Sequence, residues 1–236
     1  MADHRPERIH AAVRTLPFFR GLPTADREAI DGIATLKDLG RGDVLWNAGD
    51  AADALTLIVK GRLKIVKHGN GTDMILEIFS AGEPVGAVAV YNRMPYPASA
   101  IAIEPTTVLQ IPARDYFALL ERHPDLSRSL MSEMTRLYMS VARKLEDSRS
   151  QRVEARIAQL FLSLAERMGR PGDDGTVISM TLSRQEVAEM VGTTVESSIR
   201  VLSRWGREEI LVSGHGRFVI PSLNALRAIA EGRSDG

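Results

Sequence analysis

The chain has 236 residues, of which 44% are hydrophobic, and its formal net charge is zero because 30 basic residues balance 30 acidic ones. This length can bury a full core in one large or two small domains, and the even charge balance differs from the basic excess of many nucleic-acid-binding proteins. The absence of cysteine excludes disulfides, thiolate metal sites and cysteine-ligated iron–sulfur clusters, and the absence of a long apolar run or signal peptide predicts a cytoplasmic protein without membrane contact.

Two short helices are predicted at the start of the chain, over about residues 7–14 and 24–34. Thr24 is the expected N-cap of the second, and acidic residues follow in its first turn, where they favour the helix dipole. Neither helix carries a pattern typical of a chemical site.

Between residues 37 and 112 the pattern changes to short β-rich runs with turn residues at short, even spacing. This is typical of a small β-barrel or sandwich. We interpret Gly42, Gly49, Gly61 and Gly82 as turn positions required by backbone geometry. The predicted strands cover residues 44–46, 55–59, 63–66, 74–79, 98–103 and 107–111.

Residues 125–149 contain neither glycine nor proline and show helical spacing. Apolar residues recur at alternating steps of four and three, close to a heptad seam, which predicts a parallel homodimer. The alternative is a helix that lies across its own domain. The predicted dimer seam consists of Leu130, Met134, Leu137, Val141 and Leu145.

A polar stretch at 147–151 is a plausible hinge, after which a helix is predicted over residues 153–168 and a loop over 170–176. Near the C-terminus, the runs 210–212 and 217–220 flank a glycine-containing turn and predict a hairpin. Ser222 is the expected cap of a last helix that extends to about residue 230.

Residues 183–207 read as two helices around Gly192. Ser183 with Glu186, and Thr193 with Glu196, each fit the spacing of a capping box. The first helix would bury Val187, Ala188 and Val191. The second would bury a stripe at positions i, i+3, i+4 and i+7, formed by Ser198, Val201, Leu202 and Trp205.

The opposite face of the second helix carries Val195, Glu196, Ile199 and Arg200. An arginine can donate two hydrogen bonds to guanine, a glutamate can accept one from cytosine, and apolar side chains can contact thymine methyl groups. Glu196 could instead serve only as a helix cap, and Arg200 as a solvated surface residue. The motif as a whole favours a helix that reads DNA bases in the major groove.

The S-R-Q-E run at 183–186 and the Glu196-x-x-x-Arg200 pair resemble the cAMP receptor/Fnr family of bacterial transcription regulators, and the resemblance extends over nearly the whole chain. It implies an α+β fold with an N-terminal cyclic-nucleotide-binding-like β-roll (a double-stranded β-helix), a long dimerisation helix and a C-terminal winged helix-turn-helix. The corresponding domains are residues 1–124, 125–149 and 150–236.

The resemblance also implies how DNA is read. Residues that match Glu196 and Arg200 read a TGA-type core, which predicts a TTGA-type palindrome for a two-fold dimer. Val195 matches the residue that the Fnr branch has at this position, but Ile199 stands where that branch has a serine. The identity of the outer base of the half-site is therefore left open. Base reading is assigned to Glu196, Arg200, Val195 and Ile199, and phosphate contact to Arg184, Thr193, Thr194, Ser197, Arg204 and Arg217.

In the cAMP-responsive branch, a glutamate and an arginine hold the ribose and the cyclic phosphate. Ala87 and Ala98 stand at those positions here, and Val141 and Ala142 stand where adenine-contacting hydroxyls occur. A buried phosphate needs a cationic partner, so cAMP is an unfavourable ligand. The cofactor is unknown. Haem is one possibility, and His10 and His68 are the candidates to test as its axial ligand. No other metal site is expected.

The candidate effector pocket is apolar, and filled core is the competing interpretation of the same residues. It comprises Val85, Val88, Val90, Met94, Tyr96, Ile101 and Tyr138.

The leading hypothesis is therefore a homodimeric regulator controlled by an effector other than cAMP, with double-stranded DNA, a second copy of the chain and RNA polymerase as partners. The alternative is a constitutive DNA binder whose β-roll is a packed, ligand-free scaffold. An enzyme is the weakest hypothesis because no nucleophile motif, phosphate loop or metal cluster is seen in the sequence.

Overall fold

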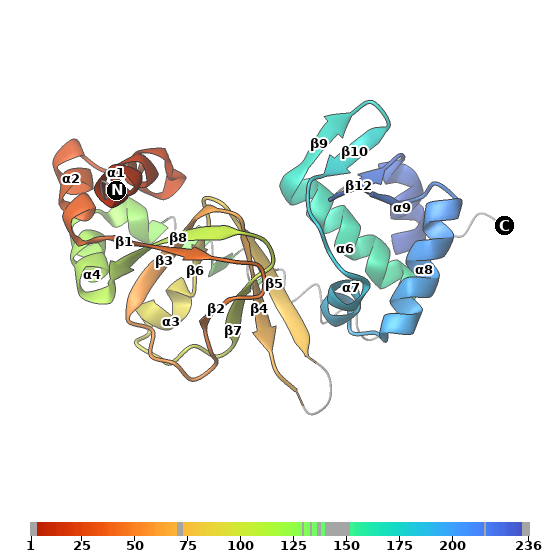
Figure 1. Cartoon of the computed structure of the whole chain (residues 1–236), viewed down its shortest axis with the longest axis horizontal. Coiled ribbons are helices and arrows are strands. Elements are labelled where there is room, and N and C mark those ends of the chain that lie inside the picture. The colour runs from red at the N-terminus through yellow and green to blue at the C-terminus, as the bar shows by residue number, and fades with distance from the viewer. Residues whose placement is uncertain are drawn as a thin grey trace. The chain divides into compact units, whose positions relative to one another are not determined.

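The computed structural model describes residues 4–69, 73–128, 130–132, 134–135, 138–139, 152–214 and 216–232. The chain divides into two compact units, Met1–Met139 and Ser140–Gly236 (Figure 1). Most of the predicted helix at 125–149 lies outside the described residues, so its length and pairing stay predictions.

The N-terminal unit is built on two four-stranded antiparallel sheets, which confirms the predicted β-roll (Figure 1). One has the order β1-β8-β3-β6 and the other the order β2-β7-β4-β5. The strands are β1 (Thr35–Leu39), β2 (Val44–Trp46), β3 (Ala54–Lys60), β4 (Arg62–Lys67), β5 (Met74–Ser80), β6 (Pro84–Val85), β7 (Ser99–Ala102) and β8 (Thr106–Pro112).

Side chains that alternate along the strands form two cores in this unit. On β3, Leu55 and Leu57 face a helical layer, whereas Ile58 faces the interior between the sheets. The period of two that places successive residues on opposite faces explains this division. The helices of the unit are α1 (Arg5–Thr15), the short 3-10 helix η1 (Pro17–Phe19), α2 (Thr24–Ile33), α3 (Ala87–Tyr91) and α4 (Ala113–Arg122).

Helix α2 corrects one predicted cap. Its N-cap residue is Pro23, and Thr24 is already the first helical residue. The fixed φ of a proline suits a helix start without a side-chain cap. The predicted turn glycines Gly42, Gly49, Gly61 and Gly82 all have positive φ, as expected.

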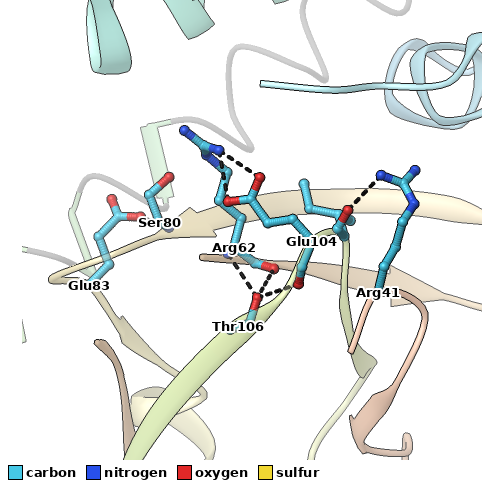
Figure 2. A network of polar contacts seen from close by, with 7 residues as sticks. Arg41, Arg62, Ser80, Glu83, Glu104 and Thr106 are labelled. Atoms are coloured by element: carbon cyan, nitrogen blue, oxygen red, sulfur yellow. Dashed lines mark hydrogen bonds and ion pairs between the residues drawn. The ribbon is translucent and has the colours of Figure 1, made fainter. Parts of the chain in front are cut away.

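A polar network closes the turn between β7 and β8 (Figure 2). The Thr106 hydroxyl accepts a hydrogen bond from the Arg62 backbone N–H and lies 2.8 Å from the Glu104 carbonyl. The Arg62 guanidinium contacts both carboxylate oxygens of Glu104, at 2.9 and 3.0 Å, and Arg41 donates to the Ile103 carbonyl. These contacts tie neighbouring turns together.

The C-terminal unit contains α6 (Val153–Met168), α7 (Arg184–Val191), α8 (Val195–Arg207) and α9 (Leu223–Ala230). Ser222 caps α9, as predicted: its hydroxyl accepts a hydrogen bond from the Ala225 N–H at 3.2 Å. The unit's core includes Phe161 of α6 and Phe218, whose ring centroids lie 4.8 Å apart. These helices with their small sheet form the predicted winged helix-turn-helix.

The sheet of this unit has the order β11-β12-β10-β9, and β12, β10 and β9 can be followed in Figure 1. Residues 170–176, predicted as a loop, form a hairpin of β9 (Gly169–Gly172) and β10 (Gly175–Ile178), so that prediction was wrong. The segment is glycine-rich and shows no alternation of side chains, so its sequence does not predict a strand. It is a strand because β10 pairs with β12. The second hairpin, β11 (Val212–Gly214) with β12 (Arg217–Ile220), is the predicted wing, with its first strand shifted toward the turn.

Candidate nucleic-acid interface

Helix α7 begins with the predicted capping box. The Ser183 hydroxyl accepts a hydrogen bond from the Glu186 N–H at 3.1 Å, and the Ser183 N–H donates to the Glu186 carboxylate at 2.9 Å. Glu186 is buried, as are Val187 and Ala188. This pair of bonds satisfies two donors at the helix start.

The turn between α7 and α8 centres on Gly192, whose φ of +67° is the left-handed conformation that glycine adopts without a steric cost. The next residue, Thr193, donates its N–H back to the Ala188 carbonyl at 3.0 Å. From α6, the Arg156 guanidinium donates to the Gly192 carbonyl at 3.2 Å. The turn is therefore held from two sides.

The predicted capping box of α8 was wrong by one residue. The N-cap is Thr194, whose hydroxyl accepts a hydrogen bond from the Ser197 N–H at 3.2 Å. Thr193 cannot serve because its backbone still closes the preceding turn. Glu196 is consequently free of a capping role, and among the described residues it makes no hydrogen bond or ion pair.

The two faces of α8 differ as predicted. The inward stripe is buried, with exposures between 0% and 3%, and includes Trp205 and Leu202. On the opposite face Val195 and Ile199 are 36% and 46% exposed, and Glu196 and Arg200 are exposed with them. Large apolar side chains left in solvent beside a free acid and a free arginine are typical of a binding surface rather than a packed one.

Arg184 lies at the N-terminus of α7 and contacts the wing. Its guanidinium donates to the Ser213 hydroxyl at 3.0 Å, and partial burial lowers the pKa of Arg184 below its ordinary value. Helix α7 and strand β11 are thereby joined at the edge of the helix-turn-helix. Arg217 lies exposed on β12 of the same wing.

The other residues predicted to contact phosphate differ in their exposure and in their contacts within the protein. Arg204 is engaged within its own unit, because it pairs with Glu154 of α6 at 2.8 Å and with Glu208 at 3.7 Å. The hydrogen bond to Glu154 raises the pKa of Arg204. Thr193 and Ser197 are half-buried, while Thr194 is exposed beside the start of α8.

The predicted effector-pocket residues are not all brought together: Val90 and Met94 line one surface groove, and the others lie elsewhere. Val85 and Tyr96 belong to the core between the sheets, whereas Val90 belongs to the core beneath the helices. Val88 and Ile101 are half-buried, and Met94 and Tyr138 are 52% and 70% exposed.

The interior between the sheets is packed, which agrees with the filled-core interpretation of these residues. Trp46 stacks on Tyr96 at a centroid distance of 4.0 Å, and its indole N–H donates to the Ala98 carbonyl at 3.1 Å. Gly86 permits this approach, since a Cβ there would lie 2.6 Å from the Tyr96 ring. Ala87 and Ala98 are buried, and the Ser99 hydroxyl accepts a hydrogen bond from the Ala48 N–H.

The two testable haem ligands each contact a carboxylate. His10 lies 2.6 Å from Asp31, and His68 lies 2.9 Å from Asp73, with about half of each histidine side chain exposed. Neither belongs to the apolar interior. Within the residues described, no cluster of three or more histidines and acids could hold a metal ion, and no helix is long and apolar enough to cross a membrane.

Of the predicted dimer seam, Leu130 is buried and Met134 packs beside it in the core of their own unit. Leu137, Val141 and Leu145 lie outside the described residues. The nearby Met131, Tyr138 and Met139 are 50% to 70% exposed.

Comparison with protein families gives two matches. Residues 36–123 match the cyclic nucleotide-binding domain, and residues 155–229 match the Crp-like helix-turn-helix domain. Both matches fall within the units described above.

Curated relatives match this chain over most of its length. The transcriptional activator protein Anr of Pseudomonas protegens is 27% identical, covering 89% of this chain and 87% of its own. The cyclic AMP receptor protein of Thermus thermophilus is 24% identical, with coverage of 92% and 97%. The global regulator CRP of Salmonella typhimurium is 29% identical, with coverage of 75% and 84%. These relatives are transcription regulators, not enzymes.

Among solved structures, FixK2 of Bradyrhizobium japonicum superimposes with a TM-score of 0.73 at 18% identity, covering 84% of this chain and 97% of its own. A CooA mutant of Carboxydothermus hydrogenoformans gives the same TM-score at 17% identity, with coverage of 86% and 90%. These similarities establish the fold. With the two domain matches and the curated relatives, they show that the chain belongs to the cAMP receptor protein/Fnr family of DNA-binding transcription regulators.

Proposed function

We propose that the protein binds a TTGA-type palindrome as a homodimer and reads each half-site with α8. The observation that carries this proposal is the exposed face of that helix, on which Glu196 and Arg200 are one turn apart and unpaired within the described residues. An arginine in this position can donate to O6 and N7 of guanine, and a glutamate can accept from the amine of cytosine.

Val195 and Ile199 complete the reading surface. Their exposed apolar side chains suit thymine methyl groups, which are the apolar feature of the major groove. Arg184 and Arg217, with Thr193, Thr194 and Ser197, are proposed to contact phosphates around α8. Arg204 is less available for such a contact because it is paired with Glu154.

Dimerisation is proposed through residues 125–149. The exposed Met131, Tyr138 and Met139 support it, because large apolar side chains gathered on a surface favour a protein interface. Two-fold symmetry then places two copies of α8 in successive major grooves. RNA polymerase is a further proposed partner, and the cytoplasm is the proposed location because the target is DNA.

We propose an effector other than a cyclic nucleotide. A buried cyclic phosphate requires a cation or several donors, and buried Ala98 and Ala87 occupy the positions where the cAMP-responsive branch has its arginine and glutamate. The second candidate, a constitutive DNA binder, is favoured by the stacked Trp46 and Tyr96, which fill the interior between the sheets.

Selection of random duplex DNA with the purified protein, combined with sedimentation of the free and bound forms, tests the proposal. We expect enriched sequences with two inverted TTGA half-sites about ten base pairs apart, bound by two protomers. Monomeric binding or an absence of enrichment would contradict it. Absorption spectra and thermal shifts are then measured with haem. A haem spectrum or a raised melting temperature would favour the regulated protein, and neither effect would favour the constitutive one.

A further inference from the structure

A surface groove of about 580 Å³ lies on the N-terminal unit, between the end of α3, the start of α4 and the loop before β3. Its apolar lining includes Val90, Met94 and Phe117. The volume falls within the range of small-molecule sites, which is about 300–1,000 Å³. This groove is separate from the packed interior between the sheets and from the DNA-reading helix.

Arg93, at the edge of the groove, has an unusual backbone. It follows the end of α3 with a φ of +52°, and the next residue, Met94, donates its N–H back to the Ala89 carbonyl. Glycine is the residue that normally ends a helix in this way, because a side chain is strained there. An arginine in this strained position motivates a search for what its side chain contacts.

The Arg93 guanidinium lies over the Phe117 ring, 5.1 Å from the ring centroid. Within the described residues it forms no ion pair. Arg114 also lines the groove and is 90% exposed, with Asp115 at 3.6 Å as its nearest acid, and Asp53 is the one acidic residue of the lining. The groove thus combines an apolar floor with two cationic groups, one of them oriented by an aromatic ring.

We propose that this groove binds an amphipathic carboxylate, that is, an organic acid with an apolar body. The body would contact Val90, Met94 and Phe117, and the carboxylate would accept hydrogen bonds from Arg93 with support from Arg114. A small acid is favoured over a protein partner because a stable protein interface involves about 20–30 residues on each side, whereas ten residues line this groove. The inference goes beyond the proposed function and depends neither on α8 nor on dimerisation.

Calorimetric titration of the full-length protein with 4-phenylbutyrate, and with 4-phenylbutan-1-ol as its uncharged match, tests the site. We expect the acid to bind about tenfold more tightly than the alcohol, because charge-assisted hydrogen bonds form only with the acid. Arg93→Gly should remove most of the preference for the acid, and Arg93→Gly combined with Arg114→Gln should reduce the acid to the affinity of the alcohol. The melting temperature of Arg93→Gly should not fall, since glycine suits a positive φ.

Arg20→Gln, at an exposed arginine elsewhere on the unit, is the matched control and should keep the tenfold preference. Equal binding of acid and alcohol, binding of neither, or an acid affinity that Arg93→Gly leaves unchanged would overturn the site. Binding of a glutamate-rich decapeptide through Arg93 without binding of phenylbutyrate would also overturn it, in favour of a protein-docking surface. Sequence-specific DNA binding by Arg93→Gly, measured in parallel, keeps this outcome separate from failure of the proposed function.

Discussion

The Arg156 guanidinium on α6 donates a hydrogen bond from Nη2 to the backbone carbonyl of Gly192 at 3.2 Å. Gly192 ends α7 in the left-handed conformation, so its carbonyl belongs to the turn that sets the angle between α7 and α8. A helix outside the reading motif therefore holds the turn inside it.

Arg156→Ala should weaken binding to the selected palindrome more than binding to random duplex DNA, because a loosened turn misplaces α8 without removing a DNA contact. A hydrogen bond from a charged donor contributes about 1.5–3 kcal/mol, which sets the scale of the expected loss of folding stability. Fluorescence anisotropy with both DNAs measures the effect. Arg156→Lys should recover part of the specificity, and Arg170→Ala, at an exposed position on β9, should leave it intact. Equal losses on both DNAs would argue against this positioning role.

Arg200→Ala should abolish discrimination at one guanine of each half-site, at a cost of about 1–3 kcal/mol per half-site against the preferred base. Competition binding with single-base variants of the palindrome measures this preference. Arg217→Ala is the contrasting change: it should weaken all sequences alike and lower the salt slope of the dimer by about two, one for each protomer. An unchanged base preference in Arg200→Ala would refute the assignment of α8 as the reading helix.

Thr194→Ala should lower the free energy of unfolding by about 1 kcal/mol, whereas Thr193→Ala should change it by much less. The reason is that the Thr194 hydroxyl caps α8, while Thr193 contributes its backbone N–H, which alanine retains. Urea denaturation without DNA measures both variants. Similar losses of unfolding free energy in the two variants would mean that both threonine hydroxyls contribute to capping α8.

The amphipathic pattern of residues 195–207 predicted α8 well, since Val201, Leu202 and Trp205 recur with the period of a helix and face one core. The exact start could not be predicted because Thr193 and Thr194 are both good N-caps, each with a polar residue three positions later. The left-handed backbone of Gly192 determines which of the two threonines caps the helix, and this conformation cannot be read from the pattern of side chains. The hairpin at 169–178 was missed for a related reason: its glycines and proline carry no alternation.

The effector pocket was predicted less well because neighbouring apolar residues serve different cores. Val90 faces the helical layer from the short helix α3, while Tyr96 returns to the interior between the sheets. Sequence proximity therefore did not indicate a shared cavity. The left-handed φ of Arg93 between them is likewise a backbone property without a sequence signal.

Asp38 should make stability depend on acid pH. Its hydrogen bond with Arg8, reinforced by the Thr107 hydroxyl, lowers the pKa of the Asp38 carboxyl to about 2. The unfolded value is about 3.9, so the folded state gains stability above that pH and loses it as the pH falls toward 2. The pair is about half exposed, which limits the contribution to less than about 1 kcal/mol.

Asp38→Asn should therefore lower the melting temperature at pH 6, and the difference should shrink as the pH falls and be small at pH 2, where about half of the folded wild-type carboxyl is protonated. Melting curves of both proteins between pH 2 and 6 measure the difference, with Asp174→Asn, at an exposed acid of the C-terminal unit, as the control. A difference that persists undiminished at pH 2 would show that the amide disturbs packing between α1 and β1 rather than removing a charge. A difference that shrinks steadily between pH 4 and 2 would establish the contact of Asp38 with Arg8 as the acid-sensitive link between these elements.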